Sequence, residues 1–146
     1  MILLTPDQIP RFWEVIKFAA IKSNYIEEEF KERYLNRLLY QLLSGKAQCF
    51  IRLDKDRKLQ MIGLTKIIVD DVIDDKTLFA IGLYSFEKVS NEIWLDDVEE
   101  LRRFALASKC KSVSAWTVNS KVVDLLKGLG FEDRFKVLTL NISGGV

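Results

Sequence analysis

Three features of the sequence predict an α/β fold in which helices cover both faces of a mixed, mostly antiparallel sheet. The first 45 residues carry apolar side chains at helical spacing, the next 40 follow the pattern of strands, and the rest alternates between the two. The predicted order is α-α-β-β-β-α-β-α-β. With 146 residues, of which 49% are hydrophobic, the chain is expected to form a single domain over residues 1–146.

The first two predicted helices occupy residues 5–45. Thr5 is placed to cap the first helix, Pro6 stands at its first helical position, and Gln8 completes a capping box. Gly45 is expected to stop the second helix. The inward positions at helical spacing are Ile9, Phe12, Trp13, Ile16 and Ala20 in the first helix, and Ile26, Phe30, Leu35, Leu38, Leu39 and Leu42 in the second.

Three strands are predicted next, in the segments "AQCFIRL", "LQMIGLTKIIV" and "TLFAIGLYSF", which form an antiparallel meander. Gly63 and Gly82 interrupt two of them, which is typical of a bulge or of close approach by another backbone. The acidic turn from Asp70 to Asp75 fits a solvated hairpin loop better than a cation site, so no metal is expected.

The second half of the chain begins with a predicted third helix, "LDDVEELRRFALASK", capped by Asp96 and Glu99, with Val98, Leu101, Phe104 and Ala105 facing inward. A strand "SVSAWTV" follows, and Asn119 caps a fourth helix, "SKVVDLLKGL". The segment "RFKVLTLNI" is predicted to be the final strand, and "SGGV" a loose tail.

The composition of the chain argues against several classes of function. The net charge of +1 gives no field that would favour nucleic acid or an anionic membrane. The N-terminus lacks the features of a signal peptide, and no apolar run is long enough to span a membrane, so a cytoplasmic protein is expected. Cys49 and Cys110 are expected to be reduced and buried. Histidine is absent, so any catalysis must use carboxylates, hydroxyls, backbone groups or water.

The predicted element order, together with "VNSKVVDLLKGLGF", resembles the GNAT superfamily of acyl-CoA-dependent N-acetyltransferases. The resemblance implies that "TLFAIGLYSF" and "SVSAWTV" splay apart and admit the pantetheine arm of acetyl-CoA. It also implies that Asn119 contacts this arm, and that Gly130 and Phe131 match the Gly-Phe that ends the family's fourth helix. Each of these residues also has a purely structural interpretation, as a helix cap, a left-handed turn and a buried aromatic.

The sequence departs from the family pattern in the loop before the third helix. Family members place a glycine-rich loop there, whose backbone N–H groups hold the coenzyme's pyrophosphate. This chain has "EKVSNEIWLDDVEE" instead. If Asp96, Asp97, Glu99 and Glu100 occupy the helix start, they repel a diphosphate. Weakened or lost coenzyme binding is therefore expected.

The second departure concerns the general acid. Family members often use a tyrosine of the fourth helix to protonate the departing thiolate, and the matching position here is Leu126. Tyr84 and Ser85, on the third strand of the meander, are the substitutes, with Glu87 as the base for the attacking amine. Ser85 is also assigned with Asn119 to coenzyme binding. The structural alternatives are a packed aromatic for Tyr84 and a solvated strand end for Glu87.

Two functions remain in competition. In the first, the chain transfers an acetyl group from acetyl-CoA to the amine of a small molecule or protein. In the second, it has lost the coenzyme and acts as a non-catalytic binding or assembly module with a protein partner. The stretch "SNEIWLDD…LRRF" is similar to the substitute loop of degenerate GNAT-like proteins of tailed phages, which implies a virion-associated rather than a cytoplasmic protein.

Overall fold

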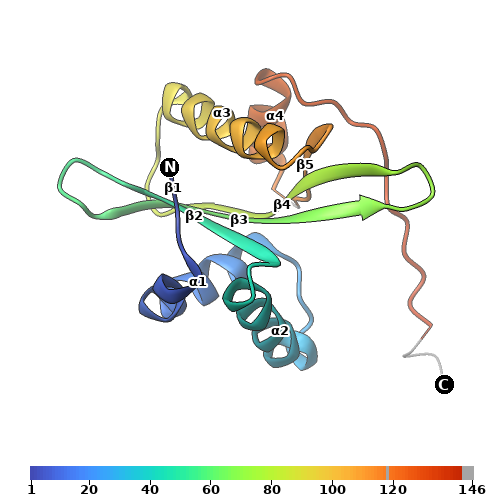
Figure 1. Cartoon of the computed structure of the whole chain (residues 1–146), viewed down its shortest axis with the longest axis horizontal. Helices are drawn as coiled ribbons and strands as arrows, with labels where there is room; N and C mark the ends of the chain where they lie inside the picture. Colours follow the sequence, from blue (N-terminus) through green and yellow to red (C-terminus); the bar gives the residue numbers. More distant parts are fainter. Residues whose placement is uncertain (118, 143–146) are drawn as a thin grey trace.

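A computed structural model of the chain describes residues 1–117 and 119–142. A five-stranded sheet lies in the middle, with α1 and α2 on one face and α3 and α4 on the other (Figure 1). The strands follow the order β1-β2-β3-β4-β5, and only β4 and β5 are parallel. The elements are β1 (Ile2–Leu3), α1 (Ile9–Ser23), α2 (Lys31–Leu43), β2 (Ala47–Leu53), β3 (Leu59–Asp70), β4 (Asp75–Ser85), α3 (Asn91–Ala107), β5 (Ser112–Ala115) and α4 (Ser120–Gly128), with 3-10 turns at Pro6–Gln8 and Glu28–Phe30.

The first layer is formed by α1 and α2, as predicted, but α2 begins only at Lys31, so Ile26 and Phe30 precede it, and Phe30, predicted to face inward, is 44% exposed. The backbone N–H of Thr5 donates to Gln8 Oε1 at 2.9 Å, and the 3-10 turn that follows continues directly into α1. Gly45 has φ of 78°, in the left-handed region that glycine tolerates, and it follows the last turn of α2. The two helices pack on the sheet through a buried cluster formed mainly by Ile9, Ile16, Ala20, Leu38, Leu42, Cys49, Ile51, Ile62 and Leu64.

The meander of β2, β3 and β4 is confirmed, and Gly82 lies beside a bulge within it. Ile81 is the extra residue of a bulge, because Leu64 pairs with Gly82 whereas Thr65 pairs with Ala80. A side chain at Gly82 would meet the end of α1, where the Cβ of Ser23 lies 3.5 Å away. The bulge and the glycine together let α1 approach this part of β4.

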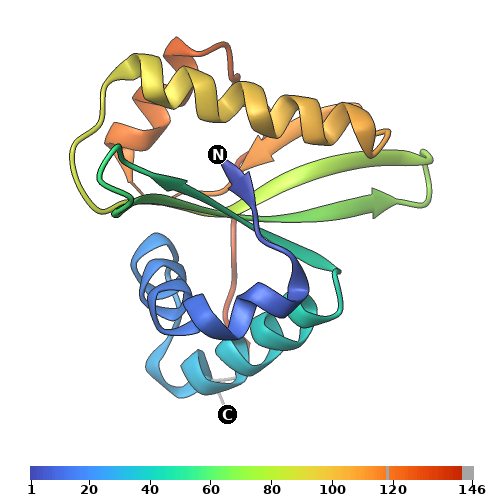
Figure 2. The same cartoon turned by 60° about the vertical axis from the view of Figure 1, so that its left-hand side comes forward.

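The second layer is formed by α3 and α4. Leu101 and Ala105 of α3 are buried against Phe50, Leu78 and Cys110, and the predicted inward positions of α3 are therefore confirmed at their centre. Figure 2 shows the two layers enclosing the sheet from opposite sides. The predicted mixed sheet with helices on both faces is confirmed.

The predicted final strand is wrong for this chain. Residues 134–142 form no strand, and their large apolar side chains are 78–92% exposed. A strand pattern alone does not form a strand, because a strand also needs a neighbour that pairs with it along its length. The segment instead runs past the sheet towards the side of α1 and α2 (Figures 1 and 2). Conversely, β1, which pairs with β2, was not predicted. The expected loose tail, residues 143–146, lies outside the described residues.

Candidate functional site

The site expected from the sequence lies where β4 and β5 separate. The two strands pair in parallel from Thr77 and Ser112 to Ala80 and Ala115, and a last hydrogen bond joins Trp116 N–H to the Ala80 carbonyl at 3.4 Å. β4 continues to Ser85, and among residues 1–117 and 119–142 no strand pairs with residues 81–85 on the β5 side. The pairing of the two strands therefore ends before β4 does, as a divergence of these strands requires.

The unpaired part of β4 is in contact with the C-terminal end of α1. Ser23 Oγ donates to the Leu83 carbonyl at 3.3 Å, and Asn24 Nδ2 donates back to the Ala20 carbonyl at 2.9 Å, which closes the last turn of α1. A carbonyl has two lone pairs, so Leu83 can accept a second hydrogen bond. α1 therefore supports this stretch of β4 without using all of its backbone groups.

Tyr84 lies in an aromatic cluster at the end of β4. Its ring meets Phe18 edge-on at 5.6 Å and Phe86 edge-on at 5.0 Å, while the rings of Phe18 and Phe86 stack at 6.1 Å. Lys22 Nζ lies 5.7 Å from the centre of the Phe18 ring. Tyr84 is half-buried on the face covered by α1 and α2. Tyr84 is thus a packed aromatic residue, as in the structural alternative. Because its side chain is partly exposed, its hydroxyl can also be tested as a proton donor.

Ser85 and Glu87 lie together just beyond Tyr84. Ser85 Oγ donates to the backbone carbonyl of Glu87, and Gln60 Nε2 donates to Glu87 Oε1 at 2.8 Å. Glu87 is exposed and borders a depression of about 400 Å³ between the β2–β3 turn and the start of α3, which is also lined by Arg52 and Ile93. The carboxylate is thus oriented by an amide while remaining open to solvent.

Asn119 stands at the start of α4, apart from the β4 residues. Its Oδ1 accepts from the backbone N–H of Lys121 at 3.0 Å, so it caps the helix as predicted. Among residues 1–117 and 119–142, no hydrogen bond or ion pair links it to Tyr84, Ser85 or Glu87. The structure therefore brings three of the four predicted site residues together and places the fourth on another element.

The predicted start of α3 is wrong. The helix begins at Asn91 rather than near Asp96, and Ser90 is its cap, with Ser90 Oγ accepting from the Ile93 N–H at 3.4 Å. The D-x-x-E pattern at Asp96 and Glu99 looks like a cap, but it lies within a helix whose inward row runs from the half-buried Ile93 through the buried position 97 to the buried Leu101. Burial of this row favours the earlier start.

The acidic residues are consequently not at the helix start. Asp96 lies five residues beyond Asn91, about 8 Å along the axis. Within the part of the chain that the structure describes, Glu92 is the only acidic residue of the first turn. Glu99 pairs with Arg102 at 3.1 Å, and Glu100 with Arg103 at 2.7 Å. The repulsion expected between these carboxylates and a diphosphate therefore does not follow from the geometry.

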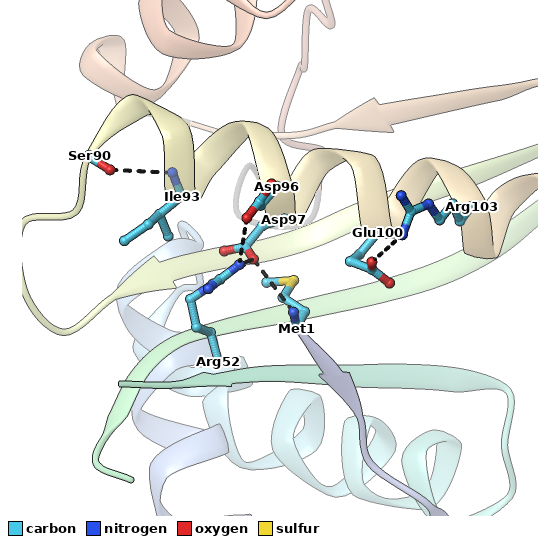
Figure 3. Close-up of polar contacts among 8 residues, drawn as sticks. All are labelled: Met1, Arg52, Ser90, Ile93, Asp96, Asp97, Glu100 and Arg103. Carbon is cyan, nitrogen blue, oxygen red and sulfur yellow. Dashed lines mark hydrogen bonds and ion pairs between the residues drawn. The ribbon is translucent and has the colours of Figure 1, made fainter. Parts of the chain in front are cut away.

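Asp97 has a role that the sequence did not indicate (Figure 3). Its side chain is 2% exposed, and its Oδ1 accepts from Arg52 Nε at 2.8 Å and pairs with the Arg52 terminal nitrogen at 2.8 Å. The amino group of Met1 lies 3.8 Å from Asp97 Oδ1. The carboxylate of Asp96 lies 3.8 Å from the Arg52 guanidinium. Oδ2 has no hydrogen-bond partner. Burial raises the pKa of Asp97, although Arg52 opposes the shift.

Leu126 and Gly130, which the sequence places at the end of the fourth helix, have structural roles at the C-terminal end of α4. Leu126 is 5% exposed, and its carbonyl accepts from the Phe131 N–H at 3.0 Å. The Gly130 N–H donates to the Lys127 carbonyl at 3.1 Å, and Gly130 has φ of 101°, so the helix ends in a Schellman motif. Gly130 has the expected left-handed conformation, Phe131 is half-buried, and the Leu126 position carries no proton donor.

Other sites considered from the sequence have structural roles. Asp70 Oδ1 accepts from the Val72 N–H at 3.0 Å, so this carboxylate closes its own turn. Over residues 1–117 and 119–142, no cluster of three or more potential metal ligands occurs, and no helix is long and apolar enough to cross a membrane. Cys49 and Cys110 are free and buried, and burial raises the pKa of the Cys49 thiol to about 12.

Comparison with solved structures identifies the fold. A protein named as a predicted acetyltransferase from Clostridium acetobutylicum, crystallised with acetyl-CoA, aligns with a TM-score of 0.74 at 12% identity over 97% of this chain and 94% of its own. The aminoglycoside 6'-N-acetyltransferase AAC(6')-Ih from Acinetobacter baumannii aligns with a TM-score of 0.69 at 11% identity over 96% and 95% of the two chains.

A ribosomal-protein-alanine N-acetyltransferase from Brucella melitensis aligns with a TM-score of 0.69 at 11% identity over 97% and 98% of the two chains. No family model matches the sequence, and no curated protein sequence matches it. The chain therefore has the fold of the GNAT acetyltransferases, established from structure at identities too low to carry over an activity.

Proposed function

We propose that the protein is an N-acetyltransferase that transfers an acetyl group from acetyl-CoA to an amine. The observation that carries the proposal is the end of the β4–β5 pairing at Ala80 and Ala115, which leaves residues 81–85 of β4 without a strand partner on that side. Backbone groups of an unpaired strand edge are suited to the amides of a pantetheine arm. The parallel pairing up to this point supports a position for such an arm along residues 81–85.

The residues around this edge fit the co-substrate only in part. The start of α3 at Asn91, which follows β4 in the chain, offers backbone N–H groups, and Ser90 Oγ accepts from that of Ile93. No glycine permits a closer approach, because residues 86–95 contain none. The geometry thus supports a weaker grip on the pyrophosphate than a glycine-rich loop would give, and the acidic residues of α3 no longer argue against binding.

The chemical roles follow from position. Glu87 is the base that accepts a proton from the incoming ammonium, directly or through water, because its carboxylate is exposed and oriented by Gln60. The amine then attacks the thioester carbonyl, a C–N bond forms and the C–S bond breaks. Tyr84 is the candidate donor to the departing thiolate, since Leu126 cannot serve. Ser85 and Asn119 are the side chains proposed to contact the coenzyme arm.

A second candidate function is a non-catalytic binding or assembly module of the same fold. Two observations favour it: the buried Leu126 where a proton donor would be expected, and the exposed apolar segment at residues 134–142. The two candidates differ in whether acetyl-CoA binds the folded chain.

The test is thermal denaturation with acetyl-CoA. At about one hundred times the dissociation constant, binding stabilises the folded state by ~2.7 kcal/mol, which raises the Tm of a domain of this size by roughly 5–10 °C. We expect such a shift, and expect coenzyme A to compete with acetyl-CoA. No shift at about 1 mM acetyl-CoA, a concentration that exceeds most coenzyme dissociation constants, would favour the second candidate.

A matched pair of variants tests the contact at Asn119. Asn119→Ser keeps an N-cap side chain but loses the amide, whereas Asn119→Ala loses both, at a cost of about 1 kcal/mol in stability. We expect the Ser variant to keep the Tm of the unliganded protein while losing much of the coenzyme-induced shift. If the Ser variant keeps the full shift, Asn119 acts as a helix cap alone.

A further inference from the structure

The depression of about 400 Å³ beside Glu87 is lined by side chains of both charges. Its volume falls within the range of about 300–1,000 Å³ that small-molecule sites occupy. Arg52 and Lys55 are the cations of the lining, and Asp54, Asp56 and Glu87 are its carboxylates. A ligand with a single charge would meet repulsion as well as attraction here, whereas a ligand with a positive and a negative end can be attracted at both.

Arg52 is held in one orientation by a buried carboxylate (Figure 3). Its Nε donates to Asp97 Oδ1 at 2.8 Å, and its Nη2 lies 2.8 Å from the same oxygen. The carboxylate of Asp96 approaches only Nη2, at 3.8 Å. Within residues 1–117 and 119–142, Arg52 Nη1 has no hydrogen-bond or ion-pair partner, and the side chain is 21% exposed. The guanidinium is thus fixed and retains N–H groups that can bind a second carboxylate.

Glu87 supplies an oriented negative charge to the same depression. Gln60 Nε2 donates to Glu87 Oε1 at 2.8 Å, and the Phe86 N–H donates to the Gln60 carbonyl at 2.9 Å, so β3 holds the residues that follow β4. Glu87 Oε2 accepts no hydrogen bond from any residue that the structure describes. This oxygen is therefore available to an ammonium group of a ligand.

The β2–β3 turn and two aliphatic side chains complete the depression. Asp54 Oδ1 accepts from the N–H groups of Asp56 and Lys58 at 2.8 and 2.9 Å, so this carboxylate is used to fix the turn. Leu53 and Ile93 are half-buried and line the same space. Carbon atoms of a ligand that contact these two side chains are removed from water, which favours binding.

We propose that the depression binds an α-amino acid with an apolar side chain, through its carboxylate at Arg52, its ammonium group at Glu87 and its side chain at Leu53 and Ile93. The size agrees: a sphere of 400 Å³ is about 9 Å across, and an amino acid spans about 3 Å between its charged groups, with a contact of about 3 Å at each end. This class of ligand satisfies both charges of the depression with one small molecule.

The role of the bound amino acid rests on the proposed function, in which its amine receives the acetyl group. The nitrogen gives one proton to Glu87 and attacks the thioester carbonyl. The C–N bond forms and the C–S bond breaks, and the second proton that the nitrogen loses balances the one that the departing thiolate takes up. The products are an N-acetyl amino acid and coenzyme A.

The binding test compares three related compounds in the absence of acetyl-CoA. L-leucine carries both charged groups, isoamylamine lacks the carboxylate, and isocaproate lacks the amine. Amide NMR shifts of the isotope-labelled protein give each dissociation constant and the place of binding. We expect L-leucine to bind with a dissociation constant of about 1 mM or below, and the other two ~10-fold or more weakly, because each lacks one contact to a charged group. Equal binding of L-leucine and isoamylamine, or no shifts in residues 52–60 and 87–93 at about 20 mM L-leucine, overturns the proposal.

Three variants separate the two ends of the ligand. Arg52→Lys keeps a positive charge beside Asp97 but loses the planar fork, and we expect it to weaken L-leucine ~10-fold or more while changing isoamylamine less than about threefold. Glu87→Gln, at an exposed position, should weaken both amines and leave isocaproate within about threefold. Lys55→Gln, on the exposed turn, is the control and should change none of the three by more than about threefold. If Arg52→Lys and Glu87→Gln affect all three compounds equally, the assignment of the two ends is wrong.

Acetyl transfer distinguishes a failure of this proposal from a failure of the proposed function. With acetyl-CoA present, we expect mass spectrometry to show N-acetylleucine forming ~10-fold or more faster than acetylated isoamylamine. If acetyl-CoA raises the Tm but L-leucine does not bind, the amino-acid site is wrong and the proposed function stands. If L-leucine binds but acetyl-CoA leaves the Tm unchanged, the amino-acid site is supported and its role as acceptor is overturned.

Discussion

The buried ion pair between Asp97 and Arg52 provides a sharp test of what holds α3 on the sheet. Removing one member of a buried pair typically costs 3–5 kcal/mol, because the other charge is left without compensation. Arg52 is 21% exposed and lies 3.8 Å from Asp96, so water and this second carboxylate recover part of the loss. We therefore expect Asp97→Ala to lower the free energy of unfolding by about 2–3 kcal/mol and the Tm by about 6–12 °C.

The neighbouring Asp96 supplies the matched control. Its side chain is 77% exposed, and its only ion pair is the 3.8 Å approach to Arg52, so Asp96→Ala should change the free energy of unfolding by no more than about 0.5 kcal/mol. Urea denaturation followed by tryptophan fluorescence measures both variants. If Asp97→Ala costs less than about 1 kcal/mol, or no more than Asp96→Ala, the buried pair does not stabilise the contact between α3 and β2.

The pH dependence tests the balance between burial and attraction at Asp97. Burial raises the pKa of Asp97 above its ordinary value of 3.8 despite the nearby Arg52. A carboxyl group with a raised pKa in the folded state contributes stability that is complete below pH 3.8 and is lost as the pH rises through the folded pKa. Relative to Asp97→Asn, which cannot titrate, the unmodified protein should gain stability as the pH falls from 7 towards 4. A relative loss would show that the attraction of Arg52 exceeds the cost of burial.

Two further predictions concern α4 and α3. Gly130→Ala should lower the free energy of unfolding by about 1 kcal/mol, because φ at residue 130 is 101°, although no atom lies within 4 Å of the new Cβ. Gly128 lies within α4 and is equally unobstructed, so Gly128→Ala should raise the free energy of unfolding by up to ~1 kcal/mol. Equal signs in the two urea midpoints would contradict the left-handed conformation at residue 130. Replacing Glu99 and Glu100 together by Gln should leave the acetyl-CoA-induced Tm shift within about 1 °C of the unmodified value, because these carboxylates lie more than two turns from the helix start and are paired. An enlarged shift would show that their field reaches the coenzyme.

Most of the fold could be predicted because its signals are local. The period of the apolar residues changes at Gly45, and the three meander strands lie within two residues of their predicted limits. Two of the errors have different causes. The prediction of the final strand was wrong because an alternating apolar pattern shows only that a segment could form a strand. It does not show that another strand lies where it can pair with that segment. The start of α3 was predicted wrongly because Ser90 and Asp96 are both plausible caps, and the local sequence does not show that Asp97 is buried with Leu101 inside the helix.

The site could be predicted less fully. The divergence of β4 and β5 and the cap at Asn119 follow from the element order and from local preference. The burial of Asp97 was not predicted, because an acidic residue within a helix normally lies on its solvent-exposed face. Only the position of Arg52 on β2, 45 residues away in the sequence, makes its burial possible. No local pattern contains that information.

The position of the α3 cap links these results to function. A helix that began at Asp96 would present several carboxylates to any phosphate bound there, and the fold would then be unsuited to a coenzyme. Because the helix begins at Asn91, the same acidic residues lie along it, and one of them turns inward to hold the helix to β2. Packing of α3 thus explains Asp97, whereas Glu99 and Glu100 form ion pairs with Arg102 and Arg103 along the exposed side of the helix. In the proposed function, coenzyme binding would instead depend on the short turn before Asn91, which has Ser90 as a cap but no glycine, and on residues 81–85 of β4, which lie beyond the pairing with β5.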